Sequence, residues 1–340
     1  MLEGEPSYRA DQLRRWLYTT PVLEASAMTN LPPGLRERLA NLWPFDVEVE
    51  QAADDGRTVK WLFRADDGAS IETVLMGYPG RATVCISSQA GCAMGCTFCA
   101  TGQFGFERHL TAGEMTAQVM YAQAFLRSNR LPGSPDHVTN VVFMGLGEPL
   151  ANYSRVRETL RRLIEEVGLS ARSLTVSTVG FVPGMRSLTA DPWPVTLAVS
   201  LHGADDELRS SLVPLNDRYP LADVEAAAAD YFAATGRRVS IEWTLIDGVN
   251  DSPDQARKLA AIARRLRAHV NVIALNPTPL SPMVPSREAH IDRFLAILRR
   301  AGANATRRDT RGQDIDAACG QLRVRQQGGD VPVQIGRSLK

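Results

Sequence analysis

Apolar and polar positions change their spacing at regular intervals along most of the chain. From residue 83 onward, short apolar runs of strand length are separated by longer stretches with the apolar spacing of amphipathic helices. The predicted strands are Thr83–Ser88, Asn140–Met144, Ser173–Ser177, Val195–Ser200, Val239–Ile246 and Val270–Leu275. The predicted helices include Thr111–Arg127, Ser154–Val167, Leu221–Thr235, Pro253–Ala268 and Glu288–Ala301.

Buried apolar strands that alternate with amphipathic helices are typical of repeated βαβ units and a parallel sheet. The pattern therefore predicts an α/β fold with a partial (β/α)6 barrel, and a doubly wound sheet is the alternative. In either architecture, functional groups gather at the carboxyl ends of the strands.

Two smaller segments precede this alternating region. Residues Tyr8 to Tyr18 have helical apolar spacing, and the turn Asp66-Asp67-Gly68 separates two strand-like runs of a hairpin. The expected divisions are a helical module at 1–45, a β-hairpin extension at 46–80, the partial barrel at 81–310 and a C-terminal segment at 311–340.

Composition adds little to this prediction. The chain has 38 basic and 38 acidic side chains, so its net charge predicts no strong nonspecific attraction to nucleic acid or membranes. Basic residues do cluster within 155–162, 257–267 and 299–311, and solvated helix faces explain these clusters as well as an RNA contact does. No apolar run is long enough for a signal peptide or a membrane span, so a cytoplasmic protein with reduced thiols is expected.

Three of the five cysteines follow the first barrel-type strand within eight residues. Cys92, Cys96 and Cys99 have the spacing that holds a 4Fe-4S cluster through three thiolates. The fourth iron then stays open and can chelate the amino and carboxylate groups of S-adenosylmethionine (SAM). A structural zinc site would need four ligands, and no second pair of Cys or His is apparent. A fully ligated cluster would need a fourth cysteine, which Cys85 could supply.

Other strand ends offer further candidates. Gly147 and Glu148 follow the second barrel strand, where a glycine turn lets the backbone approach a ligand and the carboxylate can accept from an amino group. Asn276 ends the sixth strand and could bind the adenine or ribose of SAM, although Asn-Pro also marks ordinary turns. Cys85 lies inside a strand, as a small buried hydrophobe would. Cys319 lies in a Gly-flanked segment, where a packing role and a reactive thiol are equally compatible with the pattern.

Several segments together resemble the bacterial adenine-C2 RNA methyltransferases of the RlmN family. They are VCISSQAGCAMGCTFCATGQFGFERHLTAGE, VVFMGLGEPL, AVSLHG and TRGQDIDAACGQL, and the resemblance begins at YRADQLRRWLY near the N-terminus. It implies methylation of carbon 2 of adenosine 2503 in 23S rRNA and of adenosine 37 in some tRNAs. It also implies one 4Fe-4S cluster with three Cys ligands, two SAM molecules consumed per turnover, and an electron donor such as flavodoxin or ferredoxin.

The resemblance further implies a covalent cycle. One SAM methylates Cys319, and a second gives a 5′-deoxyadenosyl radical that takes a hydrogen from the S-methyl group. The resulting carbon radical adds to the adenine, Glu72 accepts the proton of carbon 2, and Cys85 attacks Cys319 to release the product. The positions that resemble SAM contacts are Gly147, Glu148, Ser177, Ser200, Leu201, His202 and Asn276.

The expected enzyme is a monomer that binds rRNA and tRNA through its N-terminal helices and basic clusters, with no membrane association. Three alternatives stay open. A Cfr-type enzyme, which methylates carbon 8 of the same adenine, shares the five cysteines. A noncatalytic RNA-binding or ribosome-assembly protein would use the cluster only structurally. A radical-SAM activase would make a glycyl radical on a partner protein, but it needs no methyl-carrying thiol.

Overall fold

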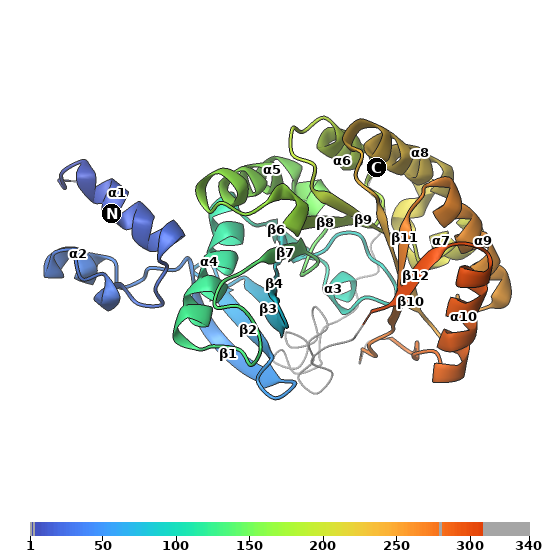
Figure 1. Ribbon diagram of the computed structural model, residues 1–340, viewed down its shortest axis with the longest axis horizontal. Helices are drawn as coiled ribbons and strands as arrows, with labels where there is room; N and C mark the ends of the chain where they lie inside the picture. The colour runs from blue at the N-terminus through green and yellow to red at the C-terminus, as the bar shows by residue number, and fades with distance from the viewer. Residues whose placement is uncertain (1, 3, 279–280, 309–340) are drawn as a thin grey trace.

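The computed structural model describes residues 2, 4–278 and 281–308 of the 340-residue chain (Figure 1). A ten-stranded sheet runs through it in the order β1-β2-β3-β4-β7-β8-β9-β10-β11-β12. Its strands are β1 Phe45–Ala53, β2 Thr58–Ala65, β3 Ser70–Tyr78, β4 Arg81–Cys85, β7 Asn140–Phe143, β8 Leu174–Thr178, β9 Thr196–Ser200, β10 Ser240–Leu245, β11 His269–Ala274 and β12 Asn304–Arg307. A separate two-stranded ribbon pairs β5 Gln89–Gly91 with β6 Phe106–His109.

The strands from β4 to β12 pair in parallel, whereas β1 to β4 pair antiparallel. The longer helices follow the barrel strands and lie along the outer side of the curved sheet (Figure 1). They are α4 Ala112–Ser128, α5 Tyr153–Arg161, α6 Val182–Thr189, α7 Asp206–Leu212, α8 Leu221–Thr235, α9 Pro253–Arg265 and α10 Glu288–Arg300. In the described part of the chain no pairing joins β1 to β12, so the barrel is open. The predicted α/β fold with a partial barrel is confirmed.

The structure adds strands that the sequence pattern did not predict. β1 pairs with β2 through a register shift between Val47 and Val49, and its outer positions are largely exposed. β12 is only four residues long and extends the parallel sheet beyond the six predicted strands. The predicted hairpin extension is therefore three-stranded, and β3 joins it directly to β4 of the barrel sheet. Short or half-exposed strands carry too few apolar positions to show a period.

The two faces of the sheet differ in chemistry. Because side chains alternate along a strand, Trp61, Val84 and Trp243 share the face that packs in the apolar core under the helices. We call the opposite face the inner face. It carries mostly polar or sulfur-containing side chains, among them Lys60, Glu72, Cys85, Ser200, Glu242 and Asn271. The apolar core thus lies on one side of the sheet, and the polar and sulfur-containing side chains lie on the other.

The N-terminal helices α1 Tyr8–Arg14 and α2 Pro33–Arg38 lie at one end of the molecule, apart from the barrel (Figure 1). They have an apolar cluster of their own, centred on the fully buried Met28 and Leu39. Trp43 connects this module to the barrel, since its ring lies edge-on against Tyr121 of α4 at 5.4 Å. None of the described helices is long and apolar enough to cross a membrane.

One buried side chain of α4 fastens the helix to the sheet. The Gln118 Oε1 atom accepts from Thr73 Oγ1 on β3 and from the Ser87 N–H after β4, both at 2.8 Å. Its Nε2 donates to the Ser87 carbonyl at 3.0 Å. Gln118 therefore satisfies both backbone groups of Ser87, at the start of the segment that leads to the cysteines.

We predict that Gln118→Leu lowers the free energy of unfolding by about 2–4 kcal/mol, because it leaves the buried N–H and C=O groups of Ser87 without partners. Urea denaturation measures the loss. Gln123→Leu is the matched control on the same helix, since Gln123 accepts from one backbone N–H, that of Val138, at 2.8 Å. Equal losses in the two variants would contradict the role assigned to Gln118.

Candidate cofactor and active site

The loop with the three clustered cysteines is fixed by backbone contacts to neighbouring elements. The Cys92 N–H donates to the Gly105 carbonyl at 2.7 Å, and the Thr97 N–H donates to the Leu212 carbonyl of α7 at 3.0 Å. Gly91 has φ +74°, and a Cβ atom there would lie 2.1 Å from the Gly105 carbonyl oxygen. Only glycine fits at this point, so the loop has a defined entry.

The sulfur atoms lie in a largely apolar environment. Cys96 is buried and Cys92 and Cys99 are half-buried, against Phe98, Leu212 and other apolar residues. Burial, together with the charges of Cys99 and Glu148, raises the pKa of the Cys92 thiol to about 12, although a backbone hydrogen bond from Met94 lowers it. Burial also raises the pKa of Cys96, with added repulsion from the other two cysteines. The three thiols are therefore close enough to repel one another as thiolates, and cationic iron would offset that repulsion.

The spacing of the sulfurs suits a cluster better than a single ion. Among the described residues, the only group of three potential metal-ligand atoms within 4.8 Å of one another is Asp247, Asp251 and His290. At least one pair of the three sulfurs is thus farther apart than 4.8 Å. A tetrahedral zinc ion with Zn–S bonds of about 2.3 Å holds its sulfurs within about 4 Å of one another. The three sulfurs, as they lie here, are therefore too far apart to share one tetrahedral zinc ion.

The turn after β7 packs directly against the chain that leads to these cysteines. A Cβ atom at Gly145 would lie 2.7 Å from the backbone of Ile86. Gly147 has φ +102°, and a Cβ atom there would lie 2.5 Å from the Cβ of Gln89. The two glycines allow the turn to pack this closely against residues 86–89. The Ser88 N–H also hydrogen-bonds to the Leu146 carbonyl at 2.8 Å, which holds the two segments together.

Glu148 follows this turn with its carboxylate fully buried. Its Oε1 atom accepts from the Leu150 N–H at 3.0 Å, and its Oε2 atom accepts from the Val179 N–H at 2.9 Å. Burial raises the pKa of Glu148 to about 7, although these two backbone hydrogen bonds lower it. Glu148 also influences the pKa of Cys92, so the carboxylate and the cysteine loop share one site. A buried carboxylate held in this way is a good acceptor for an ammonium group.

The remaining predicted SAM positions lie at neighbouring strand ends. Ser177, at the end of β8, donates to the Phe143 carbonyl at 2.6 Å. Ser200 ends β9, and the side chain of Leu201 is buried. Asn276 follows β11 and is half-buried. These residues come from adjacent strands of one sheet edge, as the prediction of a strand-end site requires.

His202, just after β9, has a mainly structural setting. It adopts φ +59°, and its Nδ1 atom accepts from the Thr244 N–H at 3.0 Å. Burial and, to a smaller extent, the charge of nearby Arg209 lower the pKa of its imidazole to about 3, so the ring is neutral. The ring lies edge-on against Phe98 of the cysteine loop, with centroids 4.6 Å apart. His202 thus connects the cysteine loop to β10.

Arg209 is a buried cation that the sequence pattern did not reveal. It lies in α7, where the sequence DELRSSL is typical of an exposed helix, yet its side chain is fully buried. Its guanidinium donates to the Val179 carbonyl and to the Asn216 side chain. Burial lowers its pKa to about 10, while its charge lowers the pKa of Cys96. Arg209 therefore supports the same Val179 segment that binds Glu148 and adds positive charge near the thiols.

Cys85 and Glu72 lie on the inner face, on two strands that pair directly. Val74 of β3 is opposite Cys85 of β4, and Glu72 lies two residues from Val74, hence on the same face. Glu72 is 2% exposed and its Oε2 atom lies 3.0 Å from the Nζ of the fully buried Lys60. A strand glutamate is ordinarily exposed, but Glu72 is buried because β2 supplies a buried cation that no sequence motif marked. Cys319 lies outside the described residues.

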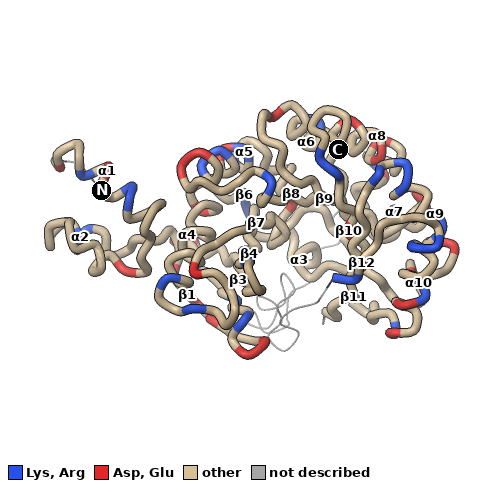
Figure 2. The backbone as a smooth tube through the Cα atoms, viewed as in Figure 1, with Lys and Arg blue, Asp and Glu red and all other residues tan. Residues whose placement is uncertain are grey.

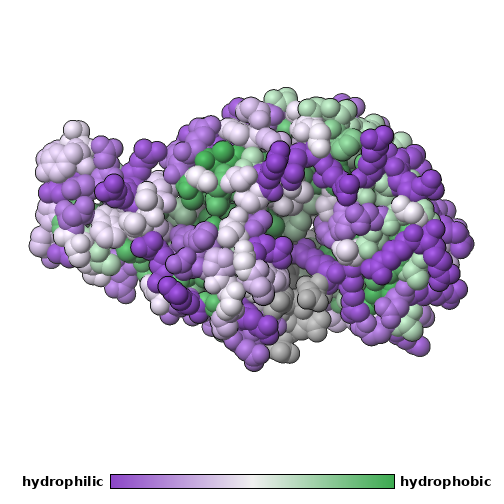
Figure 3. All heavy atoms as spheres, in the orientation of Figure 1, coloured by the Kyte–Doolittle hydropathy of each residue, from purple (hydrophilic) through white to green (hydrophobic). Residues whose placement is uncertain are grey.

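Most of the clustered basic residues have acidic partners. Arg161 and Arg162 both pair with Glu158, Arg157 pairs with Asp191, and Arg265 pairs with Glu225. Basic and acidic segments accordingly alternate along the same helices (Figure 2), and hydrophilic side chains predominate on this face of the molecule (Figure 3). These pairs favour solvated helix faces over a free positive patch on α5 and α9.

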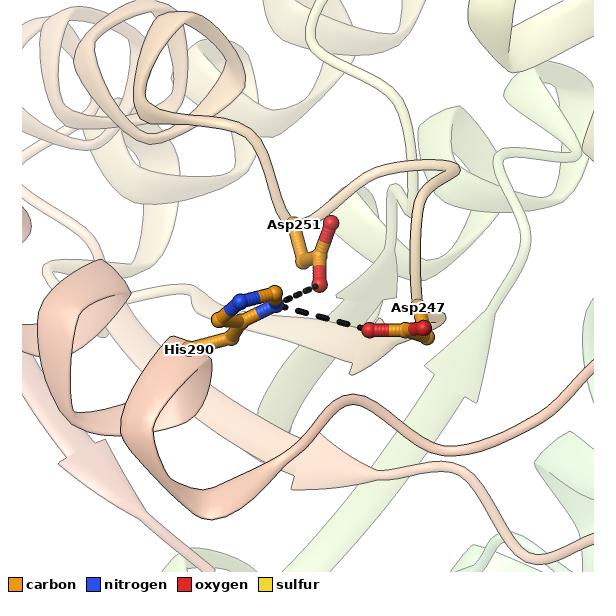
Figure 4. A group of neighbouring side chains, drawn as sticks. All are labelled: Asp247, Asp251 and His290. Carbon is orange, nitrogen blue, oxygen red and sulfur yellow. Dashed lines mark hydrogen bonds and ion pairs between the residues drawn. The ribbon is translucent and has the colours of Figure 1, made fainter.

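A second cluster of titratable groups links the loop after β10 to α10 (Figure 4). The His290 Nδ1 atom lies 3.2 Å from Asp251 Oδ2 and 3.4 Å from Asp247 Oδ1. Asp251 also accepts from Ser286 Oγ at 2.8 Å and from the Gly248 N–H at 3.1 Å. Because these donors already engage the Asp251 carboxylate, we interpret the cluster as a hydrogen-bonded link between the loop after β10 and α10.

Comparison with known proteins places this site in a wider context. The model of the radical SAM superfamily matches residues 86–260, and the model of the ribosomal RNA large subunit methyltransferase N-terminal domain matches residues 2–43. The chain is 53% identical over 328 residues to a probable dual-specificity RNA methyltransferase RlmN of Frankia alni, with 94% of this chain and 78% of that protein covered. A protein of the same name from Chloroflexus aurantiacus is 49% identical, with 94% and 88% covered. The crystal structure of a radical SAM methyltransferase from Sphaerobacter thermophilus is similar with a TM-score of 0.87 and 51% identity, covering 94% of each chain.

We predict that Gly147→Ala lowers the free energy of unfolding by about 2–4 kcal/mol, because strain at positive φ adds to the clash with Gln89. Affinity for SAM should fall as well, since the turn positions Glu148. Gly80→Ala is the matched control: its φ is +73°, but a Cβ atom there meets nothing within 4 Å. Urea denaturation and equilibrium dialysis with SAM measure both effects, and a Gly147→Ala protein as stable as Gly80→Ala would refute the close-packing argument.

Proposed function

The chain belongs to the RlmN family of the radical SAM superfamily, and on that basis we propose that it methylates carbon 2 of adenosine 2503 in 23S rRNA and of adenosine 37 in some tRNAs. The observation that carries the proposal is the strand-end site in which the cysteine loop, the glycine turn and Glu148 pack together. Family membership implies a 4Fe-4S cluster and SAM as cofactors. When bound, the cluster supplies the electron that cleaves SAM to a 5′-deoxyadenosyl radical.

We assign the cluster ligands to Cys92, Cys96 and Cys99, whose sulfurs are grouped in an apolar loop. Glu148 accepts a hydrogen bond from the ammonium group of SAM, because its carboxylate is buried beside that loop and fixed by two backbone N–H groups. Further SAM contacts are assigned to Gly147, Ser177, Ser200, Leu201, His202 and Asn276. At His202 we assign the contact to backbone groups, since Nδ1 is already engaged.

The chemistry of adenine explains why the reaction needs a carrier thiol. Carbon 2 is electron-poor and not nucleophilic, so direct attack on the SAM methyl group is unfavourable. Cys319 therefore takes a methyl group from one SAM, and a second SAM is consumed in activating that methyl group. Cys85, as its thiolate, then attacks the sulfur of Cys319, so that a disulfide forms and the bond from that sulfur to the transferred carbon breaks. The electron pair of that bond stays with the carbon, which takes up a proton and becomes the methyl group. Cys85 is suited to this step because it lies on the inner face.

We assign proton removal from carbon 2 to Glu72. Its carboxylate lies on the same face as Cys85, and its Oε2 atom lies 3.0 Å from the Lys60 ammonium. A buried ion pair contributes little to stability relative to an apolar pair of the same size, so a functional reason for its presence is attractive. Lys60 would act as a positioning residue that holds the Glu72 carboxylate in place.

The remaining assignments concern partners. We propose that residues 1–45 form an RNA-contacting module, because the N-terminal family model matches 2–43 and the module has its own apolar cluster. Residues 46–80 form the β extension, 81–310 the partial barrel and 311–340 the segment that carries the methylated cysteine. The enzyme acts as a cytoplasmic monomer, and its electron donor is a flavodoxin or ferredoxin.

The test is methylation of a 23S rRNA fragment and of tRNA by the anaerobically reconstituted protein, with nucleosides identified by mass spectrometry. We expect 2-methyladenosine. Cys319→Ala should abolish both methylation and any covalent adduct, whereas Cys85→Ala should trap a protein–RNA adduct because the thiol that releases it is gone. Formation of 8-methyladenosine would instead establish a Cfr-type enzyme.

For Glu72 we predict that Glu72→Gln lowers the rate of product formation by about 100-fold or more, as expected for loss of a general base. Cleavage of SAM to 5′-deoxyadenosine should continue, since the cluster site is unchanged. Glu50→Gln is the matched control, because Glu50 lies in the same antiparallel sheet but accepts from Trp61 Nε1 at 2.7 Å.

Glu72→Gln leaves Lys60 as a buried cation beside a neutral side chain, which threatens folding. The double variant Lys60→Met/Glu72→Gln removes both charges and separates the two effects. A folded double variant, verified by thermal melting, that still forms product at the wild-type rate would exclude Glu72 as the base.

A further inference from the structure

Besides Glu72, a second buried glutamate lies on the inner face. Glu242 is in β10, is 4% exposed and is in register with Ser200 of β9. Its Oε1 atom accepts from Ser240 Oγ and from Asn271 Nδ2, each at 2.9 Å. Its Oε2 atom is buried and has no hydrogen-bond donor in the described structure. Thus Oε1 has two hydrogen-bond donors, whereas Oε2, which we call the open oxygen, has none among the described residues.

The Oε1 side of the carboxylate is held rigidly by a chain of polar groups. The Asn271 Oδ1 atom lies 3.0 Å from His269 Nε2 on β11 and 3.2 Å from Thr306 Oγ1 on β12. These contacts orient the Asn271 amide so that its NH₂ group faces Glu242. Three adjacent strands therefore fix the direction of one carboxylate, which is how a preorganised binding group is built.

The open oxygen has one charged neighbour. The Arg308 Nη1 atom lies 3.9 Å from Glu242 Oε2, beyond hydrogen-bond distance, and is 3.6 Å from the Met144 sulfur across the inner face. This weak contact reduces the electrostatic cost of the buried charge but supplies no donor to Oε2. A buried acceptor without a donor is costly, so an absent ligand is the physical explanation that fits best.

The neighbours of Glu242 limit the chemistry of that ligand. Ser200 is one of the proposed SAM contacts, and strands in register lie about 4.8 Å apart, so Glu242 borders the proposed adenosine site. The ammonium group of SAM is already assigned to Glu148. Carboxylates at strand ends commonly accept from ribose hydroxyls in nucleotide-binding folds. The open oxygen is therefore matched to a neutral hydroxyl donor.

We propose that Glu242 is a binding residue whose Oε2 atom accepts a hydrogen bond from a ribose hydroxyl of an adenosine group on the inner face. Two ligands of the proposed reaction carry that chemistry, SAM and the target nucleotide of the RNA. The inference rests on the proposed function for the identity of these ligands, and it deepens that function by naming a residue outside the motifs that the resemblance matched.

The first arm measures binding rather than activity. The probes are S-adenosylhomocysteine and its 2′-deoxy and 3′-deoxy forms, titrated by calorimetry into the anaerobically reconstituted protein. If the hydroxyl belongs to SAM, the wild type should bind one deoxy form about 10- to 100-fold more weakly than the parent compound, the usual range for a hydrogen bond to a charged group. Glu242→Gln should bind the parent compound more weakly and lose most of this discrimination.

The second arm uses RNA in which the target adenosine lacks its 2′-hydroxyl. If the hydroxyl belongs to the RNA, the wild type should discriminate against this substrate in KM while Glu242→Gln does not, and binding of S-adenosylhomocysteine should be unchanged. Glu225→Gln is the matched control, because Glu225 is ion-paired with Arg265 on the outer helices. If the wild type does not methylate RNA, the proposed function is refuted, but the binding measurements with S-adenosylhomocysteine can still be interpreted.

Two results would overturn the inference. One is that Glu242→Gln, folded as judged by thermal melting, keeps the wild-type discrimination in both arms. The other is that Arg308→Gln reproduces every effect of Glu242→Gln, because Glu242 would then serve only as the partner of Arg308. If Glu242→Gln does not fold, Glu242→Asp replaces it, since Asp keeps the charge but withdraws the carboxylate from the ligand.

Discussion

The antiparallel pairing of β3 with β4 is the constraint on which the rest of the site depends. It makes the N-terminal hairpin and the parallel barrel one continuous sheet, with Val74 opposite Cys85. Because side chains alternate along each strand, this register determines which residues share the inner face with Cys85. A shift of the β3–β4 register by one residue would place the side chains of Glu72 and Lys60 on the opposite face, in the apolar layer under α4. Continuity of the sheet therefore decides that Glu72 and Cys85 lie on one face, near the proposed strand-end site.

The same alternation explains why buried charges are found where they are. The outer face is covered by helices and packs Trp61, Leu75 and Trp243 in the apolar core, and the Glu50 carboxylate there accepts from Trp61 Nε1. The inner face instead accommodates charges through partners: Lys60 with Glu72, and Glu242 with an amide and a distant guanidinium. Near the cysteines, Arg209 performs this role for thiolates. Each buried charge is compensated locally, which lets a stable sheet carry a reactive face.

Much of the fold was predictable because long helices and buried strands repeat their apolar positions. The predicted helix Leu221–Thr235 coincides with α8. β1 and β12 were not predicted, since one is half-exposed and the other is four residues long. The cysteine spacing indicated a cluster site, whereas the SAM positions and Glu72 came only from family resemblance. Lys60 and Arg209 were missed for a physical reason: a sequence pattern assigns charged residues to the surface, and only the fold shows that these two are buried.

Three buried glutamates show that environment, rather than residue type, assigns the chemistry. Glu148 is held by two backbone N–H groups, and burial raises its pKa to about 7, which suits it to a cationic partner. Glu72 has the lysine ammonium of Lys60 3.0 Å away, which fixes the position of its carboxylate. Glu242 has neutral donors on one oxygen and none on the other, which suits it to a neutral hydroxyl. One residue type thus fits three roles around one sheet, because each position offers it a different set of donors.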